Sequence, residues 1–268
     1  HMPDLYEGTE ITGTLRQETA EAWGMDRVPI AAGGSDNAAG AIGAGVVNQG
    51  DALLSLGTSG VIFVAGQKYL SNPQSAAHAF CHAVKDRWHL MSVMLSAASC
   101  VDWACRITQT DSVEAFIHEA EQAADFGCSE IFLPYLSGER TPHHKPNASG
   151  VLYGLRHATG TPQIAQAVLE GVAFGMADGL ESLIEAGAAV EAISVIGGGS
   201  KSFYWGRILS AILKRPLIYR DGAATGPALG AARLARFAKT GGSYESAFEG
   251  PPVLALVEPR ESAFAKLS

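Results

Sequence analysis

The chain has 268 residues, 47% apolar and 17% charged, which is typical of a globular protein large enough to bury a core without disulfides or structural metals. The formal net charge of −8 comes without a long run of either sign, and this argues against a nucleic acid or an anionic membrane as the main partner. The four cysteines form no CxxC pair and no apolar run approaches 18 residues, so we expect a cytoplasmic protein with reduced thiols and no transmembrane helix.

The first half of the chain predicts several strands joined by tight turns. A short helix is expected over 19–25, ending at Gly24, and a buried strand over 28–34. The small residues of 35–47 predict a helix with Ser35 or Asp36 as its N-cap. Each helical glycine costs about 1 kcal/mol relative to alanine, so we expect another segment to approach that backbone closely. Apolar runs then predict a hairpin over 51–66 and two further strands over 80–95.

The second half predicts alternating helices and strands. Helices are expected near 97–108 and 113–124, a strand over 130–136 and a polar loop after it. The clearest helix follows, with Thr161 as its cap, Pro162 in its first turn and Gly187 at its end. A strand over 192–196 turns into a helix over 201–213, and a strand over 216–220 precedes a helix that Thr225 would cap. The tail after Gly241 is predicted to be irregular. This order predicts an α/β fold, with a mixed sheet flanked by helices, antiparallel early and parallel later.

Three glycine-rich turns, GGSDN, GTSG and GGGS, each follow a predicted strand. Such turns can present backbone N–H groups to an anion, and a helix that starts there adds its positive end. Each turn alone is more simply a tight turn, and GGGS matches neither a GxGxxG motif nor a P-loop. Together they favour a ligand that carries phosphate.

Asp36 has two interpretations that do not exclude each other. It could be a helix N-cap, or it could accept the proton of a hydroxyl in phosphoryl transfer. The loop 138–144 could be solvated, or it could be a hinge or substrate-side loop with a Glu139–Arg140 pair. No protein metal site is expected from the adjacent His143 and His144. Core or surface roles are the simpler interpretation of His78, His82, His89, Asp102 and Trp103.

A family resemblance is carried by several segments in chain order: GGSDNAAGAIG, LSLGTSGV, FLPYLSGERTP, GVLYGL, QIAQAVLEG, IGGGSKS and GPALGAA. These segments resemble the FGGY carbohydrate kinases from about Pro3 to Ala238, and HLMSVMLSAASCVDWA and FLPYLSGERTPH are most similar to the bacterial xylulose kinases among them. The resemblance implies the actin-like ATPase (ribonuclease-H-like) fold. It also implies transfer of the γ-phosphate of ATP, with Mg²⁺, to D-xylulose, which yields xylulose 5-phosphate.

The resemblance also implies site residues. The catalytic aspartate of the family aligns with Asp36, and a substrate-contacting residue aligns with Asn37. Mg²⁺ would arrive with ATP, in reach of Asp36, without ligands from the protein alone. The γ-phosphate loop and the two walls of the adenosine pocket would be formed by Gly57, Thr58, Ser59, Ala98, Asp102, Gly197, Gly198, Gly199, Ser200 and Ser202.

The chain departs from the family pattern because the family has a further domain before this one, with its own phosphate loop and most sugar contacts. We interpret 1–27 as the last part of that domain or a tag-derived lead-in, since His1 and Met2 resemble a cloning remnant, and 28–268 as the C-terminal, nucleotide-binding domain. The family usually continues with a C-terminal helix after the point where this chain stops.

Several expectations follow from the missing half. The chain alone should have little or no kinase activity, and an apolar patch where the other domain would pack favours a homo-oligomer. The alternatives are a nucleotide-binding module without catalysis, or a kinase for glycerol, ribulose or gluconate, because the absent domain reads most of the sugar.

Overall fold

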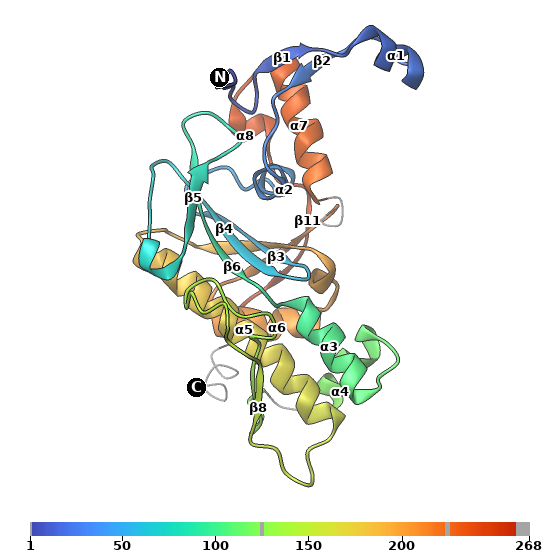
Figure 1. Cartoon of the computed structure of the whole chain (residues 1–268), viewed down its shortest axis with the longest axis vertical. Helices are drawn as coiled ribbons and strands as arrows, with labels where there is room; N and C mark the ends of the chain where they lie inside the picture. The colour runs from blue at the N-terminus through green and yellow to red at the C-terminus, as the bar shows by residue number, and fades with distance from the viewer. Residues whose placement is uncertain (1, 124–125, 223–225, 261–268) are drawn as a thin grey trace.

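A mixed sheet of seven strands forms the centre of the molecule (Figure 1). The structure is a computed structural model, and it describes residues 2–123, 126–222 and 226–260. The parallel strands lie side by side and the antiparallel ones flank them, which confirms the predicted α/β class. In order across the sheet the strands are β11 (Val253–Val257), β10 (Leu217–Arg220), β9 (Ala192–Ile196), β3 (Asp51–Leu56), β4 (Gly60–Gly66), β6 (Trp88–Met94) and β5 (His78–Cys81).

Helices cover both faces of this sheet, because its central strands are apolar on both sides. Along β3, Leu54 and Leu56 face one hydrophobic cluster while Leu53 faces another, as the two-residue period of a strand requires. The first cluster is covered by α3 (Ala98–Thr108), α4 (Val113–Ala123), α5 (Thr161–Glu185) and α6 (Phe203–Leu213). The second is covered by α2 (Asp36–Ala44), α7 (Gly226–Thr240) and the segment around α8 (Tyr244–Ala247).

The longest helix is α5, and its Val168, Val172 and Met176 are buried. The prediction that Thr161 caps it was wrong. Gly160 is the N-cap, and the side-chain oxygen of Gln163 accepts the Gly160 amide at 3.0 Å. Within the described part of the chain, none of the helices combines the length and the apolar character that a membrane span requires.

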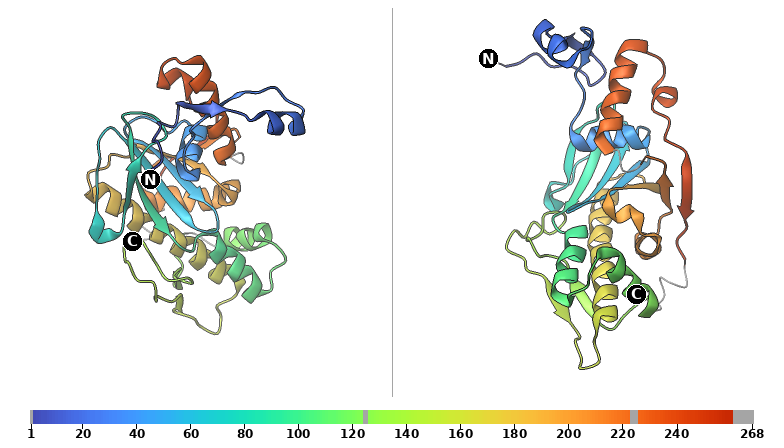
Figure 2. Two further views of the ribbon diagram at one scale, coloured as in Figure 1. Left: turned by 45° about the horizontal axis from the view of Figure 1, so that its top comes forward. Right: turned by 90° about the vertical axis from the view of Figure 1, so that its right-hand side faces the viewer.

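The N-terminal segment forms a small antiparallel sheet of its own, β1 (Ile11–Thr14) and β2 (Pro29–Ala31), with α1 (Gln17–Trp23) between them. The helix ends at Gly24, as predicted. The prediction of a buried strand over 28–34 was wrong. Within the described chain, β2 pairs only with β1, and its Ile30 keeps 43% of its surface exposed. Figure 2 shows this segment projecting beyond the body of the molecule.

Two other parts of the chain differ from the prediction. The strand expected over 130–136 is shorter, β7 (Ile131–Leu133), and pairs in a separate hairpin with an unpredicted strand, β8 (Val151–Tyr153). The tail after Gly241 is not irregular, since it forms α8 and then β11, which pairs antiparallel with β10. The single-turn helices η1 (Pro73–Ser75) and η2 (Gly198–Lys201) complete the fold. Thr225 and Ala124, at the predicted ends of two helices, lie outside the described residues.

Candidate functional site

A cleft of about 570 Å³ lies where the β3–β4 turn, α3, α4 and the η2–α6 segment meet. Residues distant in sequence, such as Gly57, Ala98 and Gly198, line this one space, so the structure brings both predicted walls together. The predicted residues that line it are Gly57, Thr58, Ala98, Asp102, Gly198, Gly199 and Ser202. Ser59, Gly197 and Ser200 are adjacent in sequence but are not among its lining residues.

The β3–β4 turn uses its carbonyl groups to hold the start of α3. The Gly57 carbonyl accepts the Ala98 amide at 2.9 Å, and the Thr58 carbonyl accepts the Ala97 amide at 2.9 Å and the Ser99 hydroxyl at 2.8 Å. The first amides of α3 are therefore occupied by protein acceptors. In the part of the chain that the structure describes, the amides of Thr58 and Ser59 donate to no protein acceptor. Adjacent amides of this kind suit an anion.

The three glycines of the GGGS turn differ in what a side chain would meet at each position. Gly197 has a φ of +91°, and a Cβ there would lie 2.7 Å from the Leu56 carbonyl oxygen, so only glycine fits. A Cβ at Gly199 would lie 2.8 Å from both Leu56 and Trp205. A Cβ at Gly198 would meet nothing within 4 Å. Gly198 is thus the one position of the three at which a side chain would enter open space at the cleft wall.

The two serines beside these glycines are engaged locally. The Ser200 hydroxyl donates to the Gly197 carbonyl at 2.7 Å, and the Ser202 hydroxyl accepts the Trp205 amide at 3.1 Å as the N-cap of α6. Their hydroxyls therefore hold the turn and the helix start in shape. Ser202 still borders the cleft, whereas Ser200 does not.

The remaining cleft wall was missed from the sequence. This wall is mostly apolar. Its Trp205 is held in place by a hydrogen bond, because the indole N–H donates to the Leu169 carbonyl at 3.1 Å. The amphipathic pattern of 113–123 signals an apolar face, but only tertiary packing decides that part of this face turns toward the cleft. The unpredicted lining residues are Leu56, Val101, Val113, Glu114, Ile117, Lys201 and Trp205.

Asp36 and Asn37 line a second, larger cleft of about 1010 Å³, together with residues of the segment 5–10, strand β5 and three histidines. Asp36 is the exposed first residue of α2, and Ser35 occupies the N-cap position without a side-chain capping bond. The Asp36 Oδ1 accepts the Asn37 amide at 2.8 Å and the Asn37 Nδ2 at 3.2 Å. Asn37 therefore fixes the carboxylate at the cleft, and Asp36 is not itself the cap.

His78, His82 and His89 all line this second cleft, and His82 and His89 are buried. The His82 Nδ1 accepts the Ala83 amide at 2.7 Å, which leaves Nε2 to donate to the Val46 carbonyl at 3.1 Å. Burial lowers the pKa of His82 to about 4. His89 stacks on Phe63 at 4.2 Å, and burial followed by the nearby His82 lowers its pKa to about 3. Both rings are therefore neutral near pH 7, and neither adds positive charge to the cleft.

The GERTP loop is anchored rather than solvated at its centre. Glu139 is buried, and its Oε1 accepts the amides of Leu95 at 3.1 Å and Arg140 at 2.7 Å, while burial raises its pKa. Thr141 is also buried, and its hydroxyl accepts the Val93 amide at 3.3 Å. The Glu139–Arg140 pair, one of the two interpretations of this loop, does not form an ion pair among the described residues, where Glu139 Oε1 accepts backbone amides instead. The loop therefore fixes the end of β6 just before the start of α3.

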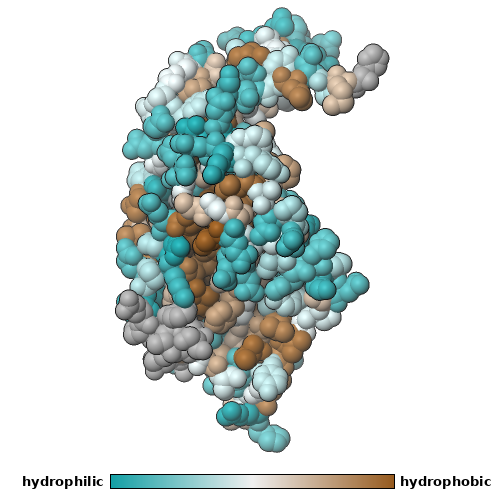
Figure 3. All heavy atoms as spheres, turned by 90° about the vertical axis from the view of Figure 1, so that its left-hand side faces the viewer, coloured by the Kyte–Doolittle hydropathy of each residue, from teal (hydrophilic) through white to brown (hydrophobic). Residues whose placement is uncertain are grey.

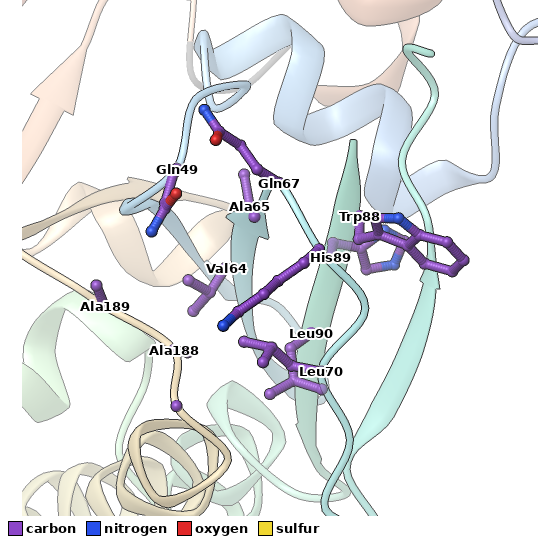
Figure 4. Close-up of a pocket in the computed structure, with 13 residues that line it drawn as sticks. Gln49, Val64, Ala65, Gln67, Leu70, Trp88, His89, Leu90, Ala188 and Ala189 are labelled. Carbon is purple, nitrogen blue, oxygen red and sulfur yellow. The ribbon is translucent and has the colours of Figure 1, made fainter. Parts of the chain in front are cut away.

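A third cavity is lined by none of the predicted site residues and is too small for a nucleotide. Figure 4 shows it between β4, β6 and the loop after α5, with Val64, Leu70 and Leu90 at its apolar side. Its volume of about 30 Å³ suits one or two water molecules. No group of three or more His, Cys, Asp or Glu side chains that could hold a metal ion occurs within 2–123, 126–222 and 226–260.

Comparison with protein-family models assigns most of the chain. The C-terminal domain model of the FGGY family of carbohydrate kinases matches residues 52–238, and the N-terminal domain model of that family matches residues 1–43. The chain belongs to the FGGY family of carbohydrate kinases. The domain boundary predicted at residue 28 stays a prediction. The match to the N-terminal model ends at residue 43 and the match to the C-terminal model begins at residue 52.

Known proteins place the chain among FGGY sugar kinases of actin-like fold. It is 55% identical over 237 residues to a xylulose kinase of Escherichia coli and 35% identical over 246 residues to one of Bacillus subtilis, covering 88% and 91% of this chain. The crystal structure of a xyloylose kinase from Brucella ovis matches 99% of this chain and 55% of its own, with 40% identity and a TM-score of 0.94. A gluconate kinase from Lactobacillus acidophilus matches 99% of this chain and 55% of its own, with 25% identity and a TM-score of 0.89. The chain spans 49% of the length of the Escherichia coli and Bacillus subtilis relatives, about half of each.

Proposed function

We propose that this chain contributes the nucleotide-binding half of a kinase that transfers the γ-phosphate of ATP to D-xylulose and yields xylulose 5-phosphate. One observation carries the proposal: the turn at Gly57, the start of α3 at Ala98 and the turn at Gly198 line a single cleft. The 55% identity to a xylulose kinase over 88% of the chain supports this choice of sugar over glycerol, ribulose or gluconate.

In this proposal the first cleft binds the nucleotide. The amides of Thr58 and Ser59 would donate to the terminal phosphates, and the apolar wall around Ile117 and Trp205 would take the adenine. Gly198 leaves the space that the ribose would need. Mg²⁺ would bind mainly through the phosphates of ATP, with the carboxylate of Asp36 in reach, as this ion usually keeps only one or two carboxylate ligands at such sites.

Asp36 would act as the general base in the second cleft. Its carboxylate would accept the proton of the attacking sugar hydroxyl and orient that oxygen toward the γ-phosphorus, while the P–O bond to ADP breaks. Asn37 holds the carboxylate through two hydrogen bonds, so little reorganisation would be needed. An ordinary aspartate suffices, because positioning and electrostatics supply most of the rate enhancement in phosphoryl transfer.

The other half of the kinase would close both clefts. Figure 3 shows that the molecule is hollowed on one side, between the N-terminal segment at the top and the body below it. We expect the remaining sugar contacts and a second phosphate loop to come from a domain that closes over this hollow. The 268-residue chain alone should therefore release no ADP in response to D-xylulose.

The role of Asp36 is tested with Asp36→Asn in the full-length kinase. A general base contributes roughly 10²–10⁴-fold, so kcat should fall by that factor, while the affinity for ATP stays at the wild-type value. Asp86→Asn is the matched control, since Asp86 is exposed in the β5–β6 turn at a φ of +58° that asparagine also tolerates, and its kcat should be unchanged. An Asp36→Asn enzyme with kcat within about threefold of wild type would remove Asp36 from the mechanism.

A further inference from the structure

Two peptide planes of the β3–β4 turn fix the direction of its outward amides. The Gly57 carbonyl accepts the Ala98 amide and the Thr58 carbonyl accepts the Ala97 amide, each at 2.9 Å. Both peptide bonds of the turn are trans, so the N–H that follows each carbonyl points the opposite way. The amides of Thr58 and Ser59 therefore point away from the start of α3, and a shift of Ala97 or Ala98 would turn them.

The segment 95–97 connects β6 to α3 and places Ala97 against the turn. Gly60, the first residue of β4, pairs with Met94, the last residue of β6. A Cβ at Gly60 would lie 3.1 Å from the Cβ of Ala97, so the turn and this segment are in contact. The direction of the outward amides therefore depends on where the segment 95–97 is held.

Glu139 holds this segment from the GERTP loop. Its Oε1 accepts the Leu95 amide at 3.1 Å, and only 3% of the residue is exposed. Among the described residues the buried hydroxyl of Ser96 has no hydrogen-bond partner, so the side chain next to Leu95 does not share this task. Without the carboxylate the Leu95 amide would lose its acceptor. An unpaired donor of this kind is costly, so we expect the segment to shift toward another acceptor.

The GERTP loop is itself held in place. Glu139 and Lys145 exchange two backbone hydrogen bonds of 2.9 Å, which close the loop into a ribbon. The Thr141 amide donates to the Val93 carbonyl at 3.2 Å, and its hydroxyl accepts the Val93 amide at 3.3 Å. The loop thus pairs with β6 beyond Met91, where the pairing with β5 ends. In Figure 1 it lies beside α5, and these contacts keep Glu139 in one position relative to β6.

We propose that Glu139 is a positioning residue for nucleotide binding, which acts through the segment 95–97 to direct the outward amides of the β3–β4 turn toward the phosphates. The inference rests on the proposed function, because it takes the first cleft as the nucleotide site. Glu139 does not line that cleft, so it makes no direct contact with ATP. The adenosine part would meet the apolar wall around Ile117 and Trp205, which Glu139 does not hold.

Calorimetric titration of the 268-residue chain with MgATP and, separately, with adenosine tests the proposal. Glu139→Met keeps the length of the side chain but removes the acceptor. It should raise the Kd for MgATP by about tenfold or more, the effect of one misplaced hydrogen-bond donor, and leave the Kd for adenosine within about threefold of wild type. Glu139→Gln keeps an oxygen that can accept the Leu95 amide, so both Kd values should equal those of wild type.

Asp51→Leu is the matched control. The Asp51 Oδ2 also accepts two backbone amides, those of Val47 at 3.1 Å and Asn48 at 2.7 Å. Asp51 is the first residue of β3, at the end of that strand opposite the turn. Its loss removes equivalent hydrogen bonds without touching the segment 95–97, so the Kd for MgATP should equal that of wild type. Circular dichroism confirms that each variant is folded.

If Glu139→Met does not fold, Thr141→Val takes its place, since it removes the hydroxyl that ties the same loop to Val93. It should raise the Kd for MgATP by about threefold and leave that for adenosine unchanged. The proposal is overturned if both Kd values rise by the same factor or neither rises, or if Asp51→Leu or Glu139→Gln loses as much affinity for MgATP. A wild-type chain that binds neither ligand would overturn the nucleotide site itself, and this proposal with it.

Discussion

The close contact between α2 and α7 decides where Asp36 sits, and Gly230→Ala tests it. A Cβ at Gly230 would lie 1.7 Å from the carbonyl oxygen of Ala39 and 2.5 Å from its carbonyl carbon. Both atoms belong to the backbone of α2, which cannot turn aside as a flexible side chain could. The two helices would have to move apart by more than about 1 Å to reach an ordinary contact distance, and overpacking of this kind costs about 3 kcal/mol or more.

Alanine also removes part of that cost, because it favours a helix over glycine by about 1 kcal/mol. The net loss in the free energy of unfolding should therefore be about 2 kcal/mol or more. Gly40→Ala is the matched control on the other helix, since a Cβ there would lie 3.8 Å from Ile196 and 4.0 Å from Pro227, both ordinary contacts. That variant should gain up to about 1 kcal/mol.

Urea unfolding followed by tryptophan fluorescence measures both variants. With a slope near 3 kcal/mol per molar urea, Gly230→Ala should lower the midpoint by about 0.7 M or more, while Gly40→Ala should raise it by roughly 0.3 M. If Gly230→Ala is as stable as Gly40→Ala, the two helices do not approach as closely as described. The reasoning that connects α7 to the position of Asp36 would then fail.

Two further predictions concern the walls of the clefts. The pKa of His89 is about 3 in the folded chain and near 6.5 when unfolded, so stability should fall as the pH drops from about 6.5 toward 3. His89→Phe keeps the stack on Phe63 but removes the group that binds the proton. Between pH 7 and pH 5, the free energy of unfolding of this variant, measured with urea, should fall by on the order of 1–2 kcal/mol less than that of wild type. Equal losses in the two proteins would refute the neutral buried ring. Ser202→Ala should cost about 1 kcal/mol of stability, because the Trp205 amide loses its acceptor, and an unchanged midpoint would show that the cap contributes nothing.

Most strands of the central sheet, antiparallel early and parallel later, could be predicted because tight turns and apolar periods are local signals. The glycines of 36–44 also signalled a close neighbour, but only the fold identifies it as α7, whose Gly230 faces Ala39. The segment 28–34 was predicted to be buried because it is apolar and ends in glycines. Within the described chain, β2 of this segment pairs only with β1. Apolar composition alone does not reveal whether a segment is buried or stays exposed in the folded chain.

The glycine turns of the candidate site could be predicted from motifs, since a positive φ and a nearby backbone carbonyl demand glycine at Gly197, and the close side chains of Leu56 and Trp205 leave no room for a Cβ at Gly199. The apolar wall could not, because Ile117 and Trp205 look like ordinary core positions of amphipathic helices. The anchoring of Glu139 by two backbone amides was also hidden, since a polar loop sequence does not show that its carboxylate is buried.

The central claim is that the cleft between the Gly57 turn and the Gly198 turn binds ATP, and calorimetric titration of the 268-residue chain with MgATP tests it most directly. Gly198→Leu places a side chain in the open space at the cleft wall, while Gly13→Leu adds the same side chain at another open position, in β1. We predict that wild type and Gly13→Leu bind MgATP with the same Kd and that Gly198→Leu, still folded, does not bind. Binding by Gly198→Leu at the wild-type Kd, or no binding by the wild-type chain, would contradict the claim.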